Sequence, residues 1–348
     1  MGDNTMNLSK LEDILKDESK YRLAQVKKAL FYHFIENWDE ATVLAKVLRE
    51  KLRANCDLEI HAKDSVSKDD RTIKSLITLS DGLKIETVLM RYQGRNTVCV
   101  SSQVGCPMAC AFCATGHGGF KRNLTQWEIV EQVLYFSRLL KKDNEHIGNV
   151  VVMGMGEPFL NYDNVLSALR ILNDKDGFNL GVRKLSVSTC GIIPGIKRFA
   201  EEKEDFNLAI SLHAPNDKLR SKLMPVNQKH NLSELFDAID EYIKKKDRKV
   251  MFEYLLIKGV NDSPEHAREL AVLMRRPLCF VNLIPYNSIE FSPPIKGGVR
   301  GGVGNKFTPS DIQTVQSFKK TLLDLGVWTT ERFRFGQDIK AACGQLVG

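Results

Sequence analysis

The sequence lacks the long hydrophobic runs that membrane proteins and secreted proteins need. It has no stretch of eighteen consecutive apolar residues, which excludes a membrane-spanning helix of ordinary length. The first twenty residues contain no apolar core of a signal peptide, and Met6 stands where a myristoylation signal needs Ser or Thr. We therefore expect a cytoplasmic protein with no membrane partner.

A disulfide framework is not expected either, because the cytosol keeps thiols reduced. The chain nevertheless has eight cysteines, and clustered thiols in such a compartment indicate metal or redox chemistry. Its 348 residues are 43% hydrophobic and 27% charged, an ordinary globular composition with room for one large and one smaller domain. The formal net charge of +7 favours a polyanionic partner such as RNA without requiring one.

The hydrophobic pattern changes along the chain and suggests four parts. Apolar residues recur at helical spacing in YRLAQVKKALFYHFIENW, whereas RTIKSLITLSDGLKIETVLMRYQGRNTVCVSS alternates apolar and polar residues around two turn signals. The predicted parts are a helical RNA-binding accessory domain at 1–70, a β-meander linker at 71–98, a partial barrel at 99–290, and a Gly-rich loop with a C-terminal extension at 291–348.

The third part repeats a strand followed by a helix. The predicted strands are NTVCVSS, NVVVMGMG, KLSVSTCG, FNLAISLHA, KVMFEYLLI and CFVNLIPYN. The helix between the first two of these strands is predicted to begin at Thr125, which forms a capping box with Glu128. This alternation predicts an α/β fold with a parallel sheet that curls into a partial (β/α)6 barrel. Chemistry in such barrels gathers at the C-terminal strand ends, where GMGEP, SLHAPND and NLIPYN lie.

Four cysteines lie close together in CVSSQVGCPMACAFC. Cys106, Cys110 and Cys113 have the spacing C-x3-C-x2-C, and Cys99 lies seven residues upstream. Three thiolates at this spacing can hold a [4Fe–4S] cluster and leave one iron open for a substrate. A structural zinc site with His117 as the fourth ligand is the alternative. The strand-end position and the aromatic residue before the last cysteine count against zinc.

The cysteine motif resembles the signature of the radical S-adenosylmethionine (SAM) enzymes, and this resemblance implies a [4Fe–4S] cluster and SAM as cofactors. Together with NVVVMGMGEP, SLHAPND, NLIPYN and AACGQL, it resembles the RlmN family from about residue 20 to the chain end. That family methylates C2 of a specific adenosine in the peptidyl transferase centre of 23S ribosomal RNA and, in some members, transfer RNA. Methylation at C8, as in the sister Cfr-like enzymes, is the alternative. An electron donor such as flavodoxin or ferredoxin is also implied.

The resemblance gives roles to two outlying cysteines and one carboxylate. Cys343 in AACGQL would accept a methyl group from one SAM molecule, and a radical made from a second would take a hydrogen atom from that methyl group. The carbon radical would add to C2, and Cys99 would release the product through a transient disulfide with Cys343. Glu86, thirteen residues before Cys99, would remove the C2 proton. Without the resemblance, Glu86 is an exposed strand residue.

The remaining implied residues contact SAM. Gly156 and Glu157 would bind its methionine end, with Glu157 pairing the ammonium group. The positions around the nucleoside and on the sixth strand are Ser188, Ser211, Leu212, His213 and Asn287. Without the resemblance, His213 would be interpreted as a structural histidine and Asn287 as a turn residue.

Three cysteines, Cys56, Cys190 and Cys279, match no family role and are predicted as buried structural thiols. Cys190 is close enough to Ser188 in sequence to line the SAM pocket. The Gly-rich segment IKGGVRGGVGNKF is longer than the family's usual segment there and is predicted as a surface insertion.

Overall fold

The computed structural model describes residues 6, 8, 10–289, 307–333 and 335–348. The segment predicted as a Gly-rich insertion lies outside these residues except for Phe307. In the described part of the chain, no helix has the length and apolar character needed to cross a membrane.

One ten-stranded sheet runs through the described residues in the order β1-β2-β3-β4-β7-β8-β9-β10-β11-β12. Its strands are β1 Ala62–Val66, β2 Thr72–Thr78, β3 Lys84–Tyr92, β4 Arg95–Val100, β7 Ile147–Val152, β8 Leu185–Thr189, β9 Asn207–Ser211, β10 Val250–Leu256, β11 Cys279–Pro285 and β12 Thr329–Glu331. From β4 to β12 all neighbours are parallel, and β1 to β4 pair antiparallel.

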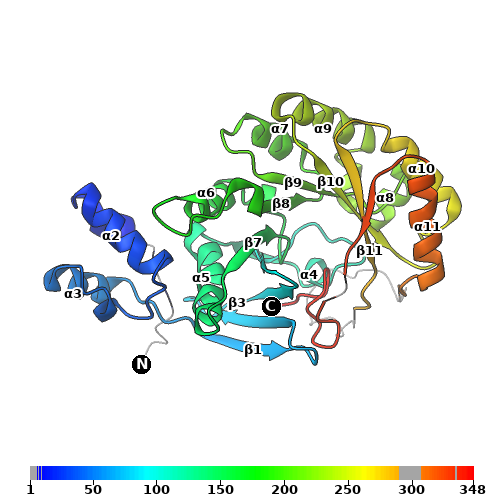
Figure 1. Ribbon diagram of the computed structural model, residues 1–348. Helices are drawn as coiled ribbons and strands as arrows, with labels where there is room; N and C mark the ends of the chain where they lie inside the picture. Colours follow the sequence, from blue (N-terminus) through cyan, green and yellow to red (C-terminus); the bar gives the residue numbers. More distant parts are fainter. Residues whose placement is uncertain (1–5, 7, 9, 290–306, 334) are drawn as a thin grey trace.

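The parallel strands curl into a partial barrel, which confirms the predicted fold class (Figure 1). Each of the six predicted strands contains most of one observed strand, from β4 to β11. The helices that follow them are α5 Gln126–Lys142, α6 Tyr162–Asn173, α7 Ile193–Glu201, α8 Asp217–Leu223, α9 Leu232–Lys246, α10 Pro264–Leu273 and α11 Ile312–Asp324. The strand β12 continues the parallel sheet beyond the six barrel strands.

Helix α5 illustrates why these sequences fold as they do. The predicted capping box is present, because Thr125 accepts from the Glu128 N–H and Glu128 accepts from the Thr125 N–H. Ile129, Val133 and Leu140 lie at helical spacing and are all buried. An apolar stripe at helical spacing thus packs this helix against the sheet, next to β4 and β7.

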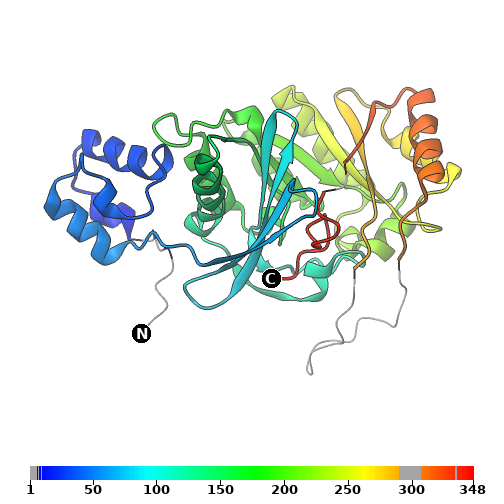
Figure 2. The same ribbon diagram turned by 60° about the horizontal axis from the view of Figure 1, so that its bottom comes forward.

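The N-terminal helices α1 Leu11–Leu15, α2 Lys20–Phe31 and α3 Lys46–Asn55 stand to one side of the barrel (Figure 2). Trp38, in the short helix η1 Trp38–Glu40, is buried among them and donates its indole N–H to the Cys56 carbonyl at 2.6 Å. Arg138 of α5 donates to the carbonyls of Leu58 and Ile35, which ties this unit to the barrel.

Antiparallel strands follow the N-terminal helices. The last of these helices ends at Asn55, and β1 lies within the 1–70 range assigned to the helical accessory domain. Its sequence AKDSV is polar and its residues are mostly exposed, so apolar alternation gave no sign of a strand. The segment predicted as a linker is continuous with the barrel, since β3 pairs with β4 over five residue pairs.

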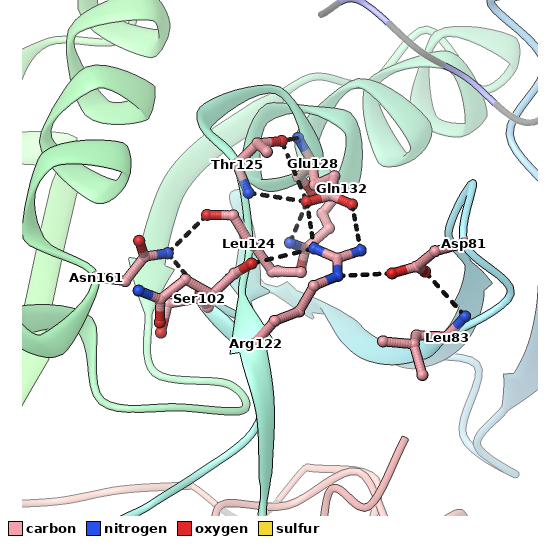
Figure 3. A network of polar contacts seen from close by, with 10 residues as sticks. Asp81, Leu83, Ser102, Arg122, Leu124, Thr125, Glu128, Gln132 and Asn161 are labelled. Atoms are coloured by element: carbon pink, nitrogen blue, oxygen red, sulfur yellow. Dashed lines mark hydrogen bonds and ion pairs between the residues drawn. The ribbon is translucent and has the colours of Figure 1, made fainter.

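The loop between β4 and α5 carries the cysteine motif, and a buried amide closes its base. Asn161 Nδ2 donates to the Ser102 carbonyl at the loop's start and to the Leu124 carbonyl at its end, both at 2.7 Å (Figure 3). Asn161 follows the helix η2 Pro158–Leu160, directly after the GMGEP segment. The loop is therefore fixed to the neighbouring strand end.

An ion-pair cluster holds the same end of the loop from the other side. Arg122 makes a two-pronged contact with Glu128 of α5, at 2.7 and 2.9 Å, and its Nε donates to Asp81 at 2.7 Å (Figure 3). Asp81 lies in the turn between β2 and β3. Two-pronged guanidinium–carboxylate contacts fix geometry as well as adding stability. Within the loop, β5 Gln103–Gly105 and β6 Phe120–Asn123 pair antiparallel.

We expect Asn161→Leu to lower the free energy of unfolding by about 3 kcal/mol, because it strips a donor from two buried carbonyls. The larger effect should be local, as faster amide hydrogen exchange over residues 103–123. Asn173→Leu is the matched control, since Asn173 Nδ2 makes one similar bond to the Leu180 carbonyl at the far end of α6. Equal exchange of this loop in both variants would contradict the assigned role.

Candidate active site

A cavity opens at the C-terminal ends of the parallel strands, where the sequence predicted the chemistry. The predicted site residues in its lining are Cys99, Cys106, Cys110, Cys113, Gly156, Glu157, Ser188, Ser211, His213, Asn287 and Cys343. Glu86 and Leu212 are outside the lining. Leu212 is fully buried beneath it and donates its N–H to the Glu253 carbonyl.

The three cysteines of the motif lie together on one wall of this cavity. Burial raises the pKa of the Cys106 thiol to about 12 and raises the pKa values of Cys110 and Cys113. Cys113 adds to the rise for both other thiols, and Cys106 adds to the rise for Cys110. Three mutually close thiols in an apolar wall fit a soft metal centre, whose binding must displace their protons.

The described residues contain no group of three or more ligand side chains gathered around a point that one metal ion could occupy. A cubane cluster does not need such a point, because each cysteine binds a different iron. His117, the fourth ligand in the zinc alternative, has Nε2 3.3 Å from the Ala111 carbonyl within the same loop. The donor set of three sulfurs therefore fits the cluster.

The cysteine loop also packs against a predicted SAM contact. The Phe112 ring meets the His213 ring edge to face at 4.8 Å. His213 is buried with a left-handed φ of 56°, and its Nδ1 accepts from the Leu255 N–H at 3.0 Å. Burial, with Arg220 nearby, lowers the pKa of His213 to about 3, so its ring is neutral. This histidine supports the loop from below.

The GMGEP segment makes close backbone contacts that only its own residue types allow. Gly156 has φ 104°, and a Cβ there would lie 2.6 Å from the Gln103 Cβ. Glu157 is buried and accepts from the N–H groups of Phe159 (3.0 Å) and Cys190 (2.7 Å). Burial raises the pKa of Glu157 despite these bonds, so a nearby cation would be needed to favour its charged form.

Ser188 and Ser211, on neighbouring strands, place their hydroxyl oxygens 3.4 Å apart in the lining. Asn287, at the end of β11, accepts at Oδ1 from Gln337 Nε2 at 2.8 Å. Cys190 also lines the cavity, as predicted. This side of the cavity therefore offers hydroxyl and amide groups suited to a nucleoside.

The C-terminal segment brings Cys343 into the cavity by docking on the cysteine loop. The Gly344 carbonyl accepts from the Ala114 N–H at 2.7 Å, and the Leu346 carbonyl accepts from the Thr115 hydroxyl at 2.6 Å. The helix α4 Ala114–His117 begins directly after Cys113. The chain end thus lies beside the middle of the sheet (Figure 1).

Cys343 and Cys99 share one wall with an arginine that the sequence did not reveal as a site residue. Arg332 Nη1 donates to Cys343 Sγ at 3.3 Å and lies 3.7 Å from Glu253 Oε1. Cys343 and Glu253 raise the pKa of the Arg332 guanidinium, which is positively charged. Burial and Cys343 raise the pKa of Cys99 to about 12.

Glu253 also belongs to a row of polar residues that sequence reasoning missed. Its Oε2 accepts from Asn282 Nδ2 at 2.9 Å, and Asn282 Oδ1 accepts from the Thr330 hydroxyl at 2.8 Å. The three residues are direct partners on β10, β11 and β12. The available signal was one glutamate within the apolar strand KVMFEYLLI, where a buried charge requires a partner.

Glu86 is buried rather than exposed, and its carboxylate is already engaged. Lys74 Nζ lies 2.7 Å from Oε1, and the Val347 N–H donates to Oε2 at 2.7 Å. The predicted base therefore contacts the same C-terminal segment that carries Cys343. With both carboxylate oxygens engaged by these two partners, Glu86 is absent from the cavity lining.

All eight cysteines, which are all among the described residues, are free thiols. The disulfide that the resemblance implies between Cys99 and Cys343 is absent from this structure. Cys56 is fully buried and burial raises its pKa to about 11, as a structural thiol would show. Cys279 is partly exposed at the start of β11.

Comparisons with known proteins match the chain to one group. Residues 100–271 match the model of the radical SAM superfamily. Two curated relatives, from Bacillus anthracis and Bacillus cytotoxicus, are each named "Probable dual-specificity RNA methyltransferase RlmN"; each is 46% identical over 98% of this chain and 92% of its own length. A crystal structure of a radical SAM methyltransferase from Sphaerobacter thermophilus superposes with a TM-score of 0.89, at 42% identity over 99% of this chain and 98% of that one.

If Cys343 accepts a methyl group from SAM, as the resemblance implies, Arg332→Met should slow this step roughly ten-fold or more, because it removes a charge-assisted hydrogen bond that orients the sulfur. Arg332→Lys should recover part of the rate. Mass spectrometry of the Cys343 peptide after a single turnover measures the effect. Arg170→Met, which removes a guanidinium paired with Glu202 and Glu204 on the surface, is the control. An unchanged rate in Arg332→Met would remove this residue from the site.

Proposed function

Because the chain belongs to the RlmN family of radical SAM RNA methyltransferases, we propose that it methylates C2 of a specific adenosine in the peptidyl transferase centre of 23S ribosomal RNA and an adenosine of transfer RNA. The observation that carries the proposal is the position of Cys343. A residue near the chain end reaches the same cavity as Cys99 and the three-cysteine motif.

The cavity residues divide into two sets by the group that they would bind. Cys106, Cys110 and Cys113 would hold a [4Fe–4S] cluster. SAM would be held by Gly156, Glu157, Ser188, Ser211, His213 and Asn287, with Leu212 supporting them from below. When bound, the two cofactors would supply the methyl group and a 5′-deoxyadenosyl radical.

The protein's own residues would handle the methyl group and the proton. C2 of adenine is electron-poor and is no nucleophile, so a carbon radical must attack it. The resemblance implies that this carbon is a methyl group first placed on a sulfur. Cys343 would take this role, with its sulfur oriented by Arg332. Cys99 would attack that sulfur afterwards and free the product, and the pair would then be a disulfide that a reductant reopens.

Glu86 would remove the C2 proton. Its present partners, Lys74 and the Val347 N–H, supply two favourable contacts to the carboxylate. For the base to reach C2, the contact with the C-terminal segment would have to be exchanged for the substrate. The protonated Glu86 would then release this proton to solvent through the opened mouth and become a carboxylate again.

The family relationship and three segments favour C2 over C8. GMGEP, SLHAPND and NLIPYN resemble the C2 group, whereas Cfr-like chains tend to replace Pro or Asn residues in these motifs. The N-terminal helical unit would add affinity for RNA phosphates, and the reaction would draw its electron from a flavodoxin or ferredoxin in the cytoplasm.

The reconstituted protein, incubated with SAM, a reductant and unmodified 23S ribosomal RNA, should yield 2-methyladenosine. Mass spectrometry against synthetic 2-methyl- and 8-methyladenosine identifies the product. Cys110→Ala should bind no intact cluster and yield neither methylated RNA nor 5′-deoxyadenosine, because a three-ligand site has no spare thiolate. Cys279→Ala, a thiol at the other end of the sheet, should behave as wild type. A product methylated at C8 would support the Cfr-like alternative.

The two outlying cysteines should fail in different ways. Cys343→Ala should form neither S-methylcysteine nor methylated RNA, since the acceptor is gone. Cys99→Ala should accept the methyl group and add to the RNA, and should then accumulate a covalent Cys343–RNA link that a denaturing gel resolves. Cys56→Ala, another buried thiol, should form no such link. Multiple turnovers by Cys99→Ala without a crosslink at any time would contradict the role of Cys99.

A further inference from the structure

The strand β12 has an exposed aromatic residue just beyond each of its ends. Trp328 precedes the strand and is 53% exposed, and Phe333 lies two residues after the strand and is 54% exposed. Each ring has a cation over it: Lys249 Nζ is 4.0 Å from the Trp328 ring centre, and Arg71 Cζ is 4.9 Å from the Phe333 ring centre. The two rings are therefore similar in exposed fraction, and each has a cationic side chain over it, but they lie at opposite ends of the strand.

Phe333 lines the cavity, whereas Trp328 is absent from the lining. The parallel strands direct their C-terminal ends toward the cavity, so Phe333 lies at its mouth and Trp328 at the other end of the sheet. Phe333 follows Arg332, the residue that contacts Cys343. A ring at this point is next to the path by which a substrate base must reach the methyl acceptor.

The ring is held in place from behind by other aromatic residues. Phe335 packs on Phe333 with ring centres 4.8 Å apart, and Tyr92 meets Phe335 edge to face at 4.4 Å. Arg95 in turn lies 4.5 Å from the centre of the Tyr92 ring. Phe335 is buried, so the cluster has an anchored inner part and one exposed outer ring. This rigid support lowers the entropy lost when a ligand stacks on Phe333.

Charge at the mouth does not explain the arrangement. The Arg71 guanidinium that covers Phe333 already makes an ion pair with Asp69 at 2.8 Å. Its charge is therefore largely balanced, and it adds a flat surface beside the ring rather than a phosphate contact. An exposed phenyl ring beside a guanidinium plane matches the face of a nucleobase, because every base has a π-face that stacks on such groups.

We propose that Phe333, backed by Phe335 and flanked by Arg71, is a stacking platform for a base of the RNA at the mouth of the cavity. This inference rests on the proposed function and names how the RNA would be held beside Cys343. It requires an unstacked base, as in a loop or an opened strand, rather than a continuous double helix. A base held on Phe333 would lead the target adenosine toward Cys343.

The test is a double-mutant cycle between the ring and the RNA bases. The ligand is a synthetic RNA stem–loop with the sequence around the methylated adenosine, and an abasic site replaces each loop nucleotide in turn. Binding to wild type, Phe333→Ala, Phe333→Trp and Trp328→Ala is measured by fluorescence anisotropy. Methylation of Cys343 by SAM in the absence of RNA is measured in parallel.

We expect Phe333→Ala to raise Kd for the intact RNA at least ~5-fold, the scale of one base–aromatic stack, while Phe333→Trp and Trp328→Ala keep near wild-type affinity. One abasic position should weaken wild type but not Phe333→Ala, which identifies the stacked base. Cys343 methylation should be unchanged in Trp328→Ala, because Trp328 is absent from the cavity lining. Additive losses at all positions, or equal losses in Phe333→Ala and Trp328→Ala, would overturn the platform. An inactive wild type would instead reject the proposed function.

Discussion

The site depends on how a long loop with little regular structure is held at both ends. Three cysteines can act as one ligand set only if the backbone between them keeps its shape, and the loop's own pairing, β5 with β6, is short. Asn161 supplies what is missing by donating to the carbonyls of Ser102 and Leu124 at once. Because this amide comes from the segment after Glu157, it also fixes the cysteine loop relative to the predicted SAM contacts. This buried side chain thus helps to set the relative position of two halves of the site, together with the hydrogen bond from the Glu157 N–H to Gln103.

The C-terminal segment docks on the same loop, so a shift of the loop would also move Cys343. Gly344 and Leu346 bind to α4 through backbone carbonyls, and α4 begins at the residue after Cys113. Cys343 is therefore positioned relative to the cysteine motif by contacts that lie one to three residues from Cys343 and one or two residues from Cys113. The low polarity around these groups raises the pKa values of Cys99, Cys110 and Glu157, and Arg332 brings a positive charge to the one place where a sulfur must be oriented.

The sequence was informative where the signal is local. Strand periodicity, the Thr125 capping box and the cysteine spacing each depend on a few neighbouring residues, and the structure has all of them in place. It was uninformative where contacts join distant segments. The strand β1 is an exposed edge whose pairing is made by backbone groups. Arg332 becomes a site residue only through Cys343 and Glu253, and Glu86 becomes buried only because Lys74 and Val347 cover it. No local pattern encodes such partners.

Cys343 lies on a different segment from the three-cysteine motif, and this separation suits the different requirements of the two groups. A cluster needs rigid ligands, whereas a residue that meets both SAM and an RNA base must be able to change partners. The chain separates these tasks: two hydrogen bonds from one buried amide close the loop that carries the cysteines, and separate single hydrogen bonds hold the segment that carries Cys343. One of these bonds ends on Glu86, so the segment that carries the methyl acceptor also covers the candidate base. Displacing it would expose acceptor and base to the substrate together, and an adenine that forms the reactive contact would be the group that uncovers the proton acceptor.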